Sequence, residues 1–557
     1  MINKMNKIKA IALASMLLSF TTFAQKAEVP KNWHQLDPAS TGYNGVSLQK
    51  AYDLAKSKKL KSKRVLVAVI DSGIDTAHED LKPILWVNKK EIPGNGIDDD
   101  KNGYIDDVNG WNFIGGKDGR NVKEDSYESA RVYYKLKTKW EGKEPITLEE
   151  KAEYAEFKRA QKSVIGDDDG GGASTILFLK QAEKNLKKAD TLLQKVLGKE
   201  TYTGKEAEAY ETKTNEEKKA KGMFLGIMKN GGGLEQTNKE FIDGLIEYTA
   251  SLEKKEDAKN NPPVAYRSNI TGDDENNLND RNYGNNDLLA STPMHGTHCA
   301  GIIAAVRNNK KGGDGMADNV SIMAIRAVPD GDEHDKDIAN AIRYAVDNGA
   351  QIISMSFGKD FSPEKEWVDD AIRYAASKNV LLVHAAGNDA KNVDTTYNFP
   401  NPIFKNGRAT NLITVGASGD KKNGGLTASF SNYGKNEVDV FAPGVNIFST
   451  LPGGDKYGPL SGTSMACPVV AGIAALMLQY YPNLTAVQLK EVIEKSAVVS
   501  KEKVNNPETK EKVLLSDISK TGGFVNAYEA LKYAAKISET KTPIVVPRTI
   551  IKKGKKG

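Results

Sequence analysis

Ser461-Gly462-Thr463-Ser464-Met465-Ala466-Cys467-Pro468 is followed at once by an apolar run from Val469 to Leu478. The run predicts a buried helix, and Gly462 ahead of it lets the backbone approach another molecule closely. The first N–H groups of a helix have no partner inside it, so they point at whatever lies before the helix. A serine there becomes a nucleophile only if a neighbouring base takes its proton. Alone, the stretch is equally consistent with a tight turn into a core helix.

A second stretch, Val65-Leu66-Val67-Ala68-Val69-Ile70-Asp71-Ser72-Gly73-Ile74-Asp75, begins with six apolar residues. Such a run predicts a strand buried on both faces, as in a parallel sheet. The strand ends at Asp71, and Gly73 turns the chain. Because ligands of open α/β sheets bind at the carboxyl ends of strands, Asp71 is a candidate functional residue. The alternative is an aspartate that only caps the turn.

A third stretch, His295-Gly296-Thr297-His298-Cys299-Ala300-Gly301, leads into small and apolar residues from Ile302 to Val306. A lone histidine is more often structural than catalytic. Here, however, an Asp, a His and a Ser each open or close a regular element beside a glycine. They follow one another in the chain in the order Asp, His, Ser, which is the order of the subtilisin triad.

On these residues the chain resembles the subtilisin-like serine peptidases, or subtilases. The resemblance implies an α/β fold, with a mostly parallel β-sheet covered by helices on both faces. It also implies peptide hydrolysis through an acyl-enzyme, without a cofactor for catalysis, on protein or peptide substrates. By position Asp71 matches the acid of the triad, His295 the general base and Ser464 the nucleophile.

Two more segments match the family in the same order. Asn388, at the end of Ala385-Ala386-Gly387-Asn388, matches the asparagine that donates to the oxyanion together with the Ser464 N–H. Ser354-Met355-Ser356-Phe357-Gly358 matches the segment that pairs with an extended substrate by strand addition. Asn398-Phe399-Pro400 should line the pocket for the residue before the cut, with Asn398 where relatives often have glycine. The implied substrate-binding residues are Ser356, Phe357, Gly358, Ala385, Ala386 and Gly387.

The N-terminal 24 residues have the pattern of a signal peptide. Three lysines precede an apolar run from Ile11 to Phe20, and Thr22-Phe23-Ala24 stands before Gln25 as a small-x-small cleavage site. A membrane anchor is the alternative, but the run is too short to span a bilayer comfortably. We therefore expect an exported protein, secreted or periplasmic, without a membrane anchor.

A long segment rich in Lys, Glu and Ala separates the Asp and His motifs and predicts helices, with Thr147-Leu148-Glu149-Glu150 as a capping box. We divide the chain into residues 25–117 and 263–540 as the two parts of a catalytic domain, 118–262 as a helical insertion and 541–557 as a basic tail. The insertion is interpreted as solvated helices, with a role in partner binding or as a lid as the alternative.

An acidic stretch predicts a structural cation. Asp98, Asp100 and Asn102 alternate, Gly103 takes the sixth position and Asp106 the ninth of a calcium loop of the EF-hand type. The twelfth position holds Asn109 instead of a bidentate glutamate. We favour calcium, bound by Asp98, Asp100, Asn102 and Asp106, over a merely solvated acidic loop.

Charge and cysteine content narrow the function further. A net charge of +5 over 557 residues, with no basic patch interleaved with aromatics, gives no basis for nucleic-acid binding. The two cysteines, Cys299 and Cys467, are expected to be buried thiols behind the site, with a disulfide as the alternative. Two other functions stay open beside a broad endopeptidase: a selective maturation protease controlled by the insertion, and a non-catalytic binding protein on the same fold.

Overall fold

The computed structural model describes residues 29–539, except for 167–171, 232–233, 235–236, 291–292 and 423. The expected signal peptide, 1–24, and the basic tail, 541–557, lie outside the described residues.

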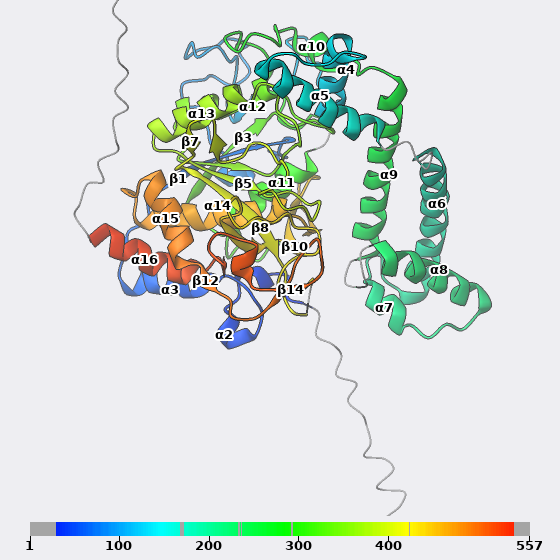
Figure 1. The fold of residues 1–557 in the computed structure, drawn as a ribbon. Coiled ribbons are helices and arrows are strands. Elements are labelled where there is room, and N and C mark those ends of the chain that lie inside the picture. Colours follow the sequence, from blue (N-terminus) through cyan, green and yellow to red (C-terminus); the bar gives the residue numbers. More distant parts are fainter. Residues whose placement is uncertain are drawn as a thin grey trace, which may run out of the picture. The chain divides into compact units, whose positions relative to one another are not determined.

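A nine-stranded sheet forms the centre of the fold (Figure 1). Every neighbouring pair in it is parallel except the outermost pair, β12 with β15. The parallel sheet expected from the buried apolar runs is confirmed. In spatial order the strands are β12 (Val498–Val499), β15 (Gly523–Phe524), β9 (Val440–Pro443), β8 (Leu412–Ser418), β5 (Leu381–Ala385), β4 (Ile352–Met355), β1 (Val65–Asp71), β3 (Val320–Arg326) and β2 (Gly110–Asn112).

Helices cover both faces of this sheet (Figure 1). On one face α12 (Asp335–Asp347) and α13 (Lys365–Ser377) pack on alternate strand residues such as Ala68 and Ile70. On the other face lies α14 (Thr463–Tyr480), which contacts β4, β5, β8 and β9. Three further helices accompany α14 on that side: α3 (Leu48–Ser57), α15 (Ala486–Ser496) and α16 (Ala527–Glu539). The α/β fold class predicted from the sequence is confirmed.

Among the described residues one helix, α14, is long and apolar enough to cross a membrane by length and composition. Of this helix, 89% is buried within the protein. Its apolar character is therefore explained by its position in the core, where it contacts both the sheet and α11 (Met294–Ala304).

The segment ahead of β1 is part of the same core. Trp33 is fully buried, and its indole N–H donates to the carbonyl oxygen of Val445 at 3.1 Å. The N–H of Ala527, at the start of α16, donates to the carbonyl oxygen of Val46 at 2.8 Å. The short elements here are the 3₁₀-helix η1 (Trp33–Gln35) and α2 (Pro38–Thr41).

Small elements complete the sheet-containing part of the chain. In the described part of the chain, three antiparallel two-stranded sheets lie outside the main sheet: β10 (Ile447–Leu451) with β11 (Lys456–Leu460), β6 (Ile403–Phe404) with β7 (Gly407–Arg408), and β13 (Val504–Asn505) with β14 (Lys512–Val513). Two short 3₁₀-helices also occur, η2 (Lys82–Ile84) and η3 (Leu515–Asp517).

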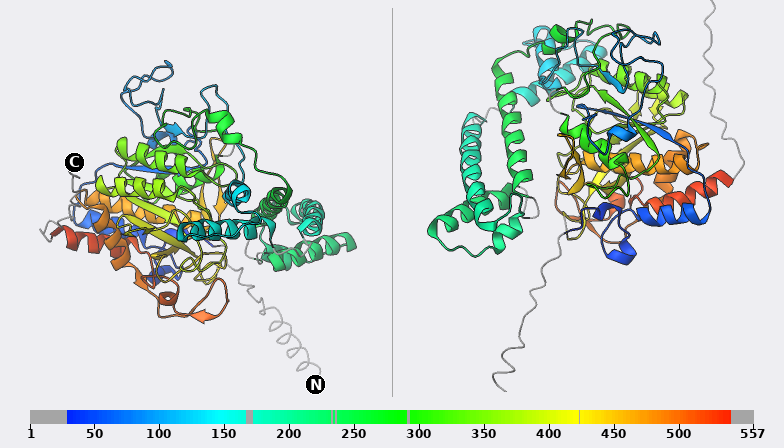
Figure 2. Two further views of the ribbon diagram at one scale, coloured as in Figure 1. Left: turned by 45° about the horizontal axis from the view of Figure 1, so that its top comes forward. Right: turned by 180° about the vertical axis from the view of Figure 1, so that it is seen from behind.

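The segment between β2 and α11 is helical, as expected from its composition. The capping box at Thr147 and Glu150 is present at the start of α5. One apolar cluster joins α4 and α5, and a second joins α6 through α9, which lie side by side (Figures 1 and 2). The helices are α4 (Glu128–Trp140), α5 (Leu148–Ile165), α6 (Gly172–Leu197), α7 (Gly204–Ala209), α8 (Asn215–Gly231), α9 (Asn238–Asn260) and α10 (Tyr266–Thr271).

Ion pairs of the buried His334 attach both ends of this helical segment to the loop before α12. The two ring nitrogens of His334 face carboxylate oxygens, Nε2 that of Asp125 at 3.0 Å and Nδ1 that of Glu275 at 2.8 Å. Burial and Arg131 lower the pKa of His334, but its hydrogen bonds to Asp125 and Glu275 outweigh them, so the net shift is upward. The imidazolium form, which donates from both nitrogens, fits this position.

Candidate active site

The site is built at the carboxyl end of β1, where the strand delivers Asp71 to the edge of the sheet. Helix α11 approaches the same turn and carries His295 as its second residue. The close approach requires a glycine after the histidine, because a Cβ on Gly296 would lie 2.2 Å from the carbonyl oxygen of Gly73 and 3.0 Å from the Asp71 Cβ. The glycine of the His-Gly pair is therefore what lets the two motifs meet.

The Asp71 carboxylate holds the imidazole of His295. Nδ1 of His295 donates to Oδ1 of Asp71 at 2.8 Å, and the N–H of Ser72 donates to the same oxygen at 2.8 Å. The Asp71 side chain is 3% exposed, whereas that of His295 is 36% exposed. A buried carboxylate thus orients a histidine that solvent and substrate can reach. Donation from Nδ1 leaves Nε2 as the basic nitrogen.

Ser464 is the second residue of α14, and its environment depends on a proline four residues later. Pro468 has no N–H, so it cannot make the helical bond to the Ser464 carbonyl oxygen. That oxygen accepts instead from Oγ of Ser356 at 2.9 Å and from Sγ of Cys299 at 3.4 Å. The Ser464 hydroxyl donates to the carbonyl oxygen of Ser356 at 3.2 Å. The proline thereby leaves this oxygen to contacts with Ser356, the residue after β4, and with Cys299 in α11.

Asn388 stands beside the serine with its amide held in one orientation. Its Oδ1 accepts from both the N–H and the hydroxyl of Thr463, each at 2.9 Å. This leaves Nδ2 as the group that faces the space over Gly462: a Cβ on Gly462 would lie 3.5 Å from Asn388 Nδ2 and 3.5 Å from the Ser464 N. Two N–H donors thus flank an open position next to the hydroxyl, and such a pair can hold negative charge that develops on an oxygen.

The six expected substrate-binding residues differ in their exposure to solvent. Gly358 is exposed, and Gly387 adopts a left-handed conformation with φ of 98°. Ser356 is buried under Ser464, while the carbonyl oxygen of Phe357 accepts from Nε2 of His384 at 2.7 Å. Ala385 and Ala386 are both buried, so their side chains support the surface from within.

Asn398 narrows the space next to Gly358. Its Nδ2 donates to the carbonyl oxygen of Ala385 at 3.1 Å, and its Oδ1 would be 2.4 Å from a Cβ on Gly358. The amide therefore lies between the Gly358 segment and the end of β5.

Both cysteines are buried and form no disulfide, as expected. Burial, followed by the charge of Asp71, raises the pKa of the Cys299 thiol well above its usual range, and burial raises the pKa of Cys467 to about 11. Both are neutral thiols at ordinary pH. Each packs against the site, since Cys467 Sγ lies 3.3 Å from the carbonyl oxygen of Val383 and Cys299 contacts Ser464.

In the acidic loop the structure brings in a residue that the motif did not include. Carboxylate oxygens of Glu91, Asp98 and Asp100 all lie within 4.8 Å of one another. The other two predicted ligands face backbone donors: Asn102 Oδ1 accepts from the Tyr104 N–H, and Asp106 accepts from the N–H groups of Gly94 and Gly96. Glu91 precedes the loop, and no spacing rule for calcium loops points to it.

A buried aspartate beside an oriented histidine, a serine at a helix start and two convergent N–H donors are the groups that serine hydrolases use. The Subtilase family profile matches residues 62–517, and the chain belongs to this family of serine endopeptidases. The expectation drawn from the motifs is confirmed at the level of the family.

Individual relatives are similar over part of the chain. Thermophilic serine proteinase from a Bacillus strain is 40% identical over 240 residues, 43% of this chain and 52% of that protein. Thermitase from Thermoactinomyces vulgaris is 38% identical over 253 residues, 44% of this chain and 78% of that protein. An alignment with the solved structure of a Pseudoalteromonas arctica protease covers 90% of this chain and 97% of that one, at 21% identity and a TM-score of 0.44. The chain thus spans about half of the first relative's length.

Proposed function

We propose that this protein is an exported serine endopeptidase that hydrolyses peptide bonds through an acyl-enzyme. Asp71, His295, Ser464 and Asn388 act as acid, general base, nucleophile and oxyanion donor. The observation that carries the proposal is the 2.8 Å bond from His295 Nδ1 to Asp71, beside a helix start where Ser464 and two N–H donors meet. Export rests on the signal-peptide pattern of residues 1–24, which predicts a secreted or periplasmic protein.

The mechanism starts from the tautomer of His295. Because Nδ1–H donates to Asp71, the lone pair of the imidazole is on Nε2, the nitrogen that takes the Ser464 proton. The Ser464 hydroxyl exchanges its long bond to the Ser356 carbonyl for this nitrogen, and its oxygen attacks the scissile carbonyl. Asp71 stabilises the imidazolium without taking its proton. His295 then protonates the leaving amine, and water repeats the sequence on the acyl-enzyme.

The developing oxyanion is held by Asn388 Nδ2 and the Ser464 N–H. One such donor contributes about 2.7–4 kcal/mol to the transition state, a magnitude measured in subtilisin itself. The peptide substrate pairs with the exposed segment at Gly358 by strand addition, which places its carbonyl over Gly462. This segment and Ala385-Ala386-Gly387 act as the substrate-binding residues.

The Asn388→Asp substitution separates the donor from the acceptor function of this side chain. The new carboxylate keeps an oxygen for the N–H and hydroxyl of Thr463 but presents an anionic oxygen where Nδ2 was. We expect kcat for a peptide substrate to fall at least about 10²–10³-fold, with the melting temperature changed little. Steady-state kinetics and thermal unfolding of the same preparation measure both. A kcat near that of the wild type would exclude Asn388 as an oxyanion donor.

We further propose that the acidic loop binds a structural calcium ion, held by Glu91, Asp98 and Asp100. The donor set fits a hard cation, since all three groups are carboxylates and their oxygens converge within 4.8 Å. Asp98 also accepts from the N–H groups of Asn102 and Gly103, at 3.0 and 2.8 Å, which fixes its oxygens. Asn102 and Asp106 shape the loop. The ion would hold the loop together and supply no chemistry.

Removal of calcium should therefore destabilise the fold without changing the chemical step. With calcium at about one hundred times its dissociation constant, binding contributes about 2.7 kcal/mol, so for a chain of this length we expect a chelator to lower the melting temperature by about 2–3 °C. Asp98→Asn and Glu91→Gln should remove most of this calcium dependence, and calorimetric titration should show their loss of binding. Glu144→Gln, at an exposed position, is the matched control. Equal melting temperatures with chelator and with calcium would contradict the site.

A selective maturation protease is the second candidate, because the helical segment touches the substrate-binding part of the chain. Helix α4 supplies Glu128, whose carboxylate pairs with the buried Lys359 next to Gly358. Digestion of unfolded casein distinguishes the two functions: a broad enzyme degrades it to small peptides, whereas a selective one leaves it largely intact. A non-catalytic binding protein is disfavoured, since the four catalytic positions keep their residues.

A further inference from the structure

Among the contacts of helix α5 with the substrate-binding part of the chain are those of the Arg159 side chain, beside an apolar cluster that joins α5 to Phe361. Its guanidinium carbon lies 3.6 Å from the centre of the Phe361 ring and 4.5 Å from that of Tyr397. One guanidinium nitrogen donates to the carbonyl oxygen of Asp360 at 2.8 Å. Glu156, one turn earlier in α5, accepts from the other two nitrogens at 3.0 and 2.7 Å. The guanidinium plane is therefore fixed while its faces contact two aromatic rings.

The two rings belong to two chain segments that are paired with each other. Lys359 and Phe399 exchange backbone hydrogen bonds of 3.2 and 2.8 Å as an antiparallel bridge. Tyr397 stacks on Phe399 with ring centres 5.5 Å apart. Segments 358–361 and 397–399 thus form one unit, and Arg159 contacts both of its strands. Gly358 and Asn398, which border the proposed substrate pocket, lie in this unit.

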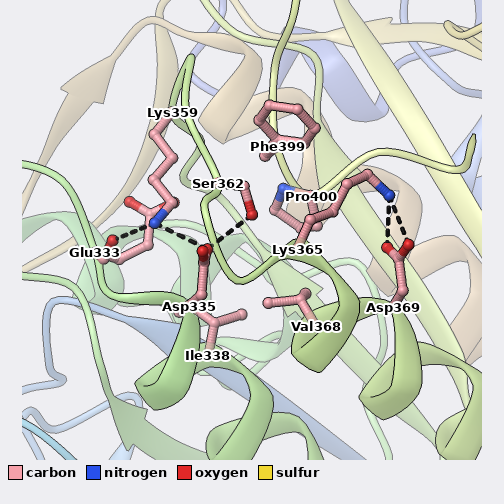
Figure 3. A pocket seen from close by; sticks show the side chains of 10 residues that line it. All are labelled: Glu333, Asp335, Ile338, Lys359, Ser362, Lys365, Val368, Asp369, Phe399 and Pro400. Atoms are coloured by element: carbon pink, nitrogen blue, oxygen red, sulfur yellow. Dashed lines mark hydrogen bonds and ion pairs between the residues drawn. The ribbon is translucent and has the colours of Figure 1, made fainter. Parts of the chain in front are cut away.

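A second set of contacts holds Lys359, which belongs to the same unit. The ammonium of Lys359 lies 2.9 Å from the Asp335 carboxylate and 2.7 Å from the Glu333 carbonyl oxygen, and Phe399 and Pro400 line the same cavity (Figure 3). The cavity among these side chains measures about 10 Å³, room for about one water molecule. It is too small for a substrate side chain. Tyr397, by contrast, is 49% exposed and contacts Arg159.

We propose that Arg159 is a positioning residue for peptide binding: from α5 it clamps segments 358–361 and 397–399 and so sets the affinity for the residue ahead of the scissile bond. This inference rests on the proposed function. It gives the helical segment a role in substrate binding, through contacts on the wall of the pocket. Arg159 lies outside the hydrogen bonds of Asp71, His295 and Ser464, so the chemical step is independent of it.

Arg159→Met, which keeps the length of the side chain and removes its charge, tests the role. We expect KM for a short peptide substrate to rise about three- to tenfold, from the loss of cation–π and hydrogen-bonding contacts. The value of kcat should stay within about twofold, and a small fluorophosphonate probe should label Ser464 at the wild-type rate. Arg159→Lys, which keeps the charge without the planar guanidinium, should give an intermediate KM.

Lys158→Met is the matched control, since Lys158 is the neighbouring residue and contacts Tyr154, Phe157 and Gln161 within α5. Tyr397→Leu approaches the same contact from the other side and replaces Arg159→Met if the latter does not fold. An unchanged KM in Arg159→Met, or an equal rise in Lys158→Met, would overturn the inference. A wild-type protein that takes no probe and cleaves no peptide contradicts the proposed function instead.

Discussion

Ser464→Ala should abolish peptide hydrolysis and covalent labelling by a fluorophosphonate, while the protein folds as before. The loss in kcat should be on the order of 10⁶-fold, the size measured when the corresponding serine of subtilisin is removed. The free energy of unfolding should change little, because the hydroxyl makes one long hydrogen bond, 3.2 Å, to the Ser356 carbonyl oxygen. The backbone contacts that tie Ser464 to Ser356 and Cys299 do not involve its side chain.

Mass spectrometry of the labelled wild type should place the probe on the peptide that contains Ser464. Ser461→Ala is the control from the same stretch: its hydroxyl accepts from the Asn446 N–H at 2.9 Å and is not among the proposed catalytic groups. This variant should keep its label and its activity. Label on any other residue, or undiminished hydrolysis by Ser464→Ala, would show that the nucleophile lies elsewhere.

The elements that carry the triad could be predicted from short motifs because each motif combines a chemical group with its geometric requirement. Six apolar residues before Asp71 specify a buried strand, and the glycine after His295 specifies a close approach that the structure places against Gly73. The free carbonyl oxygen of Ser464, which Pro468 causes, could also be predicted from the sequence. A proline four residues after a helical residue leaves that residue's carbonyl without its donor.

Contacts between segments far apart in the chain could not be predicted in this way. The folded loop brings the Glu91 carboxylate close to those of Asp98 and Asp100, and no fixed spacing in the sequence relates Glu91 to Asp98. Arg159 and Asp360 are 201 positions apart, and the pattern of α5 marks Arg159 only as one charged residue among many. A periodic pattern identifies the face of a helix but not the surface that the face meets.

Asp71→Asn should reduce kcat about 10⁴-fold, the size seen when the acid of such a triad is converted to its amide. The carboxylate here accepts twice at Oδ1, from the Ser72 N–H and from His295 Nδ1. Its Oδ2 is buried and has no hydrogen-bond partner among the described residues. Both orientations of an asparagine amide at this position are therefore unfavourable.

With its NH₂ group at the Oδ1 position, the amide opposes the Ser72 N–H and turns His295 into the tautomer that carries its proton on Nε2, which cannot accept from Ser464. With its oxygen at that position, the tautomer is kept, but a buried NH₂ has no acceptor and the imidazolium loses its counter-charge. Both orientations lower kcat, and NMR of the His295 ring nitrogens identifies which one is adopted.

Asp75→Asn is the control, because Asp75 is also buried and accepts from the N–H groups of Gly453 and Gly454. We expect that variant to lose stability but to keep kcat within a few-fold; if Asp71→Asn lost no more activity than Asp75→Asn, the carboxylate would be a structural group and the triad assignment would be wrong.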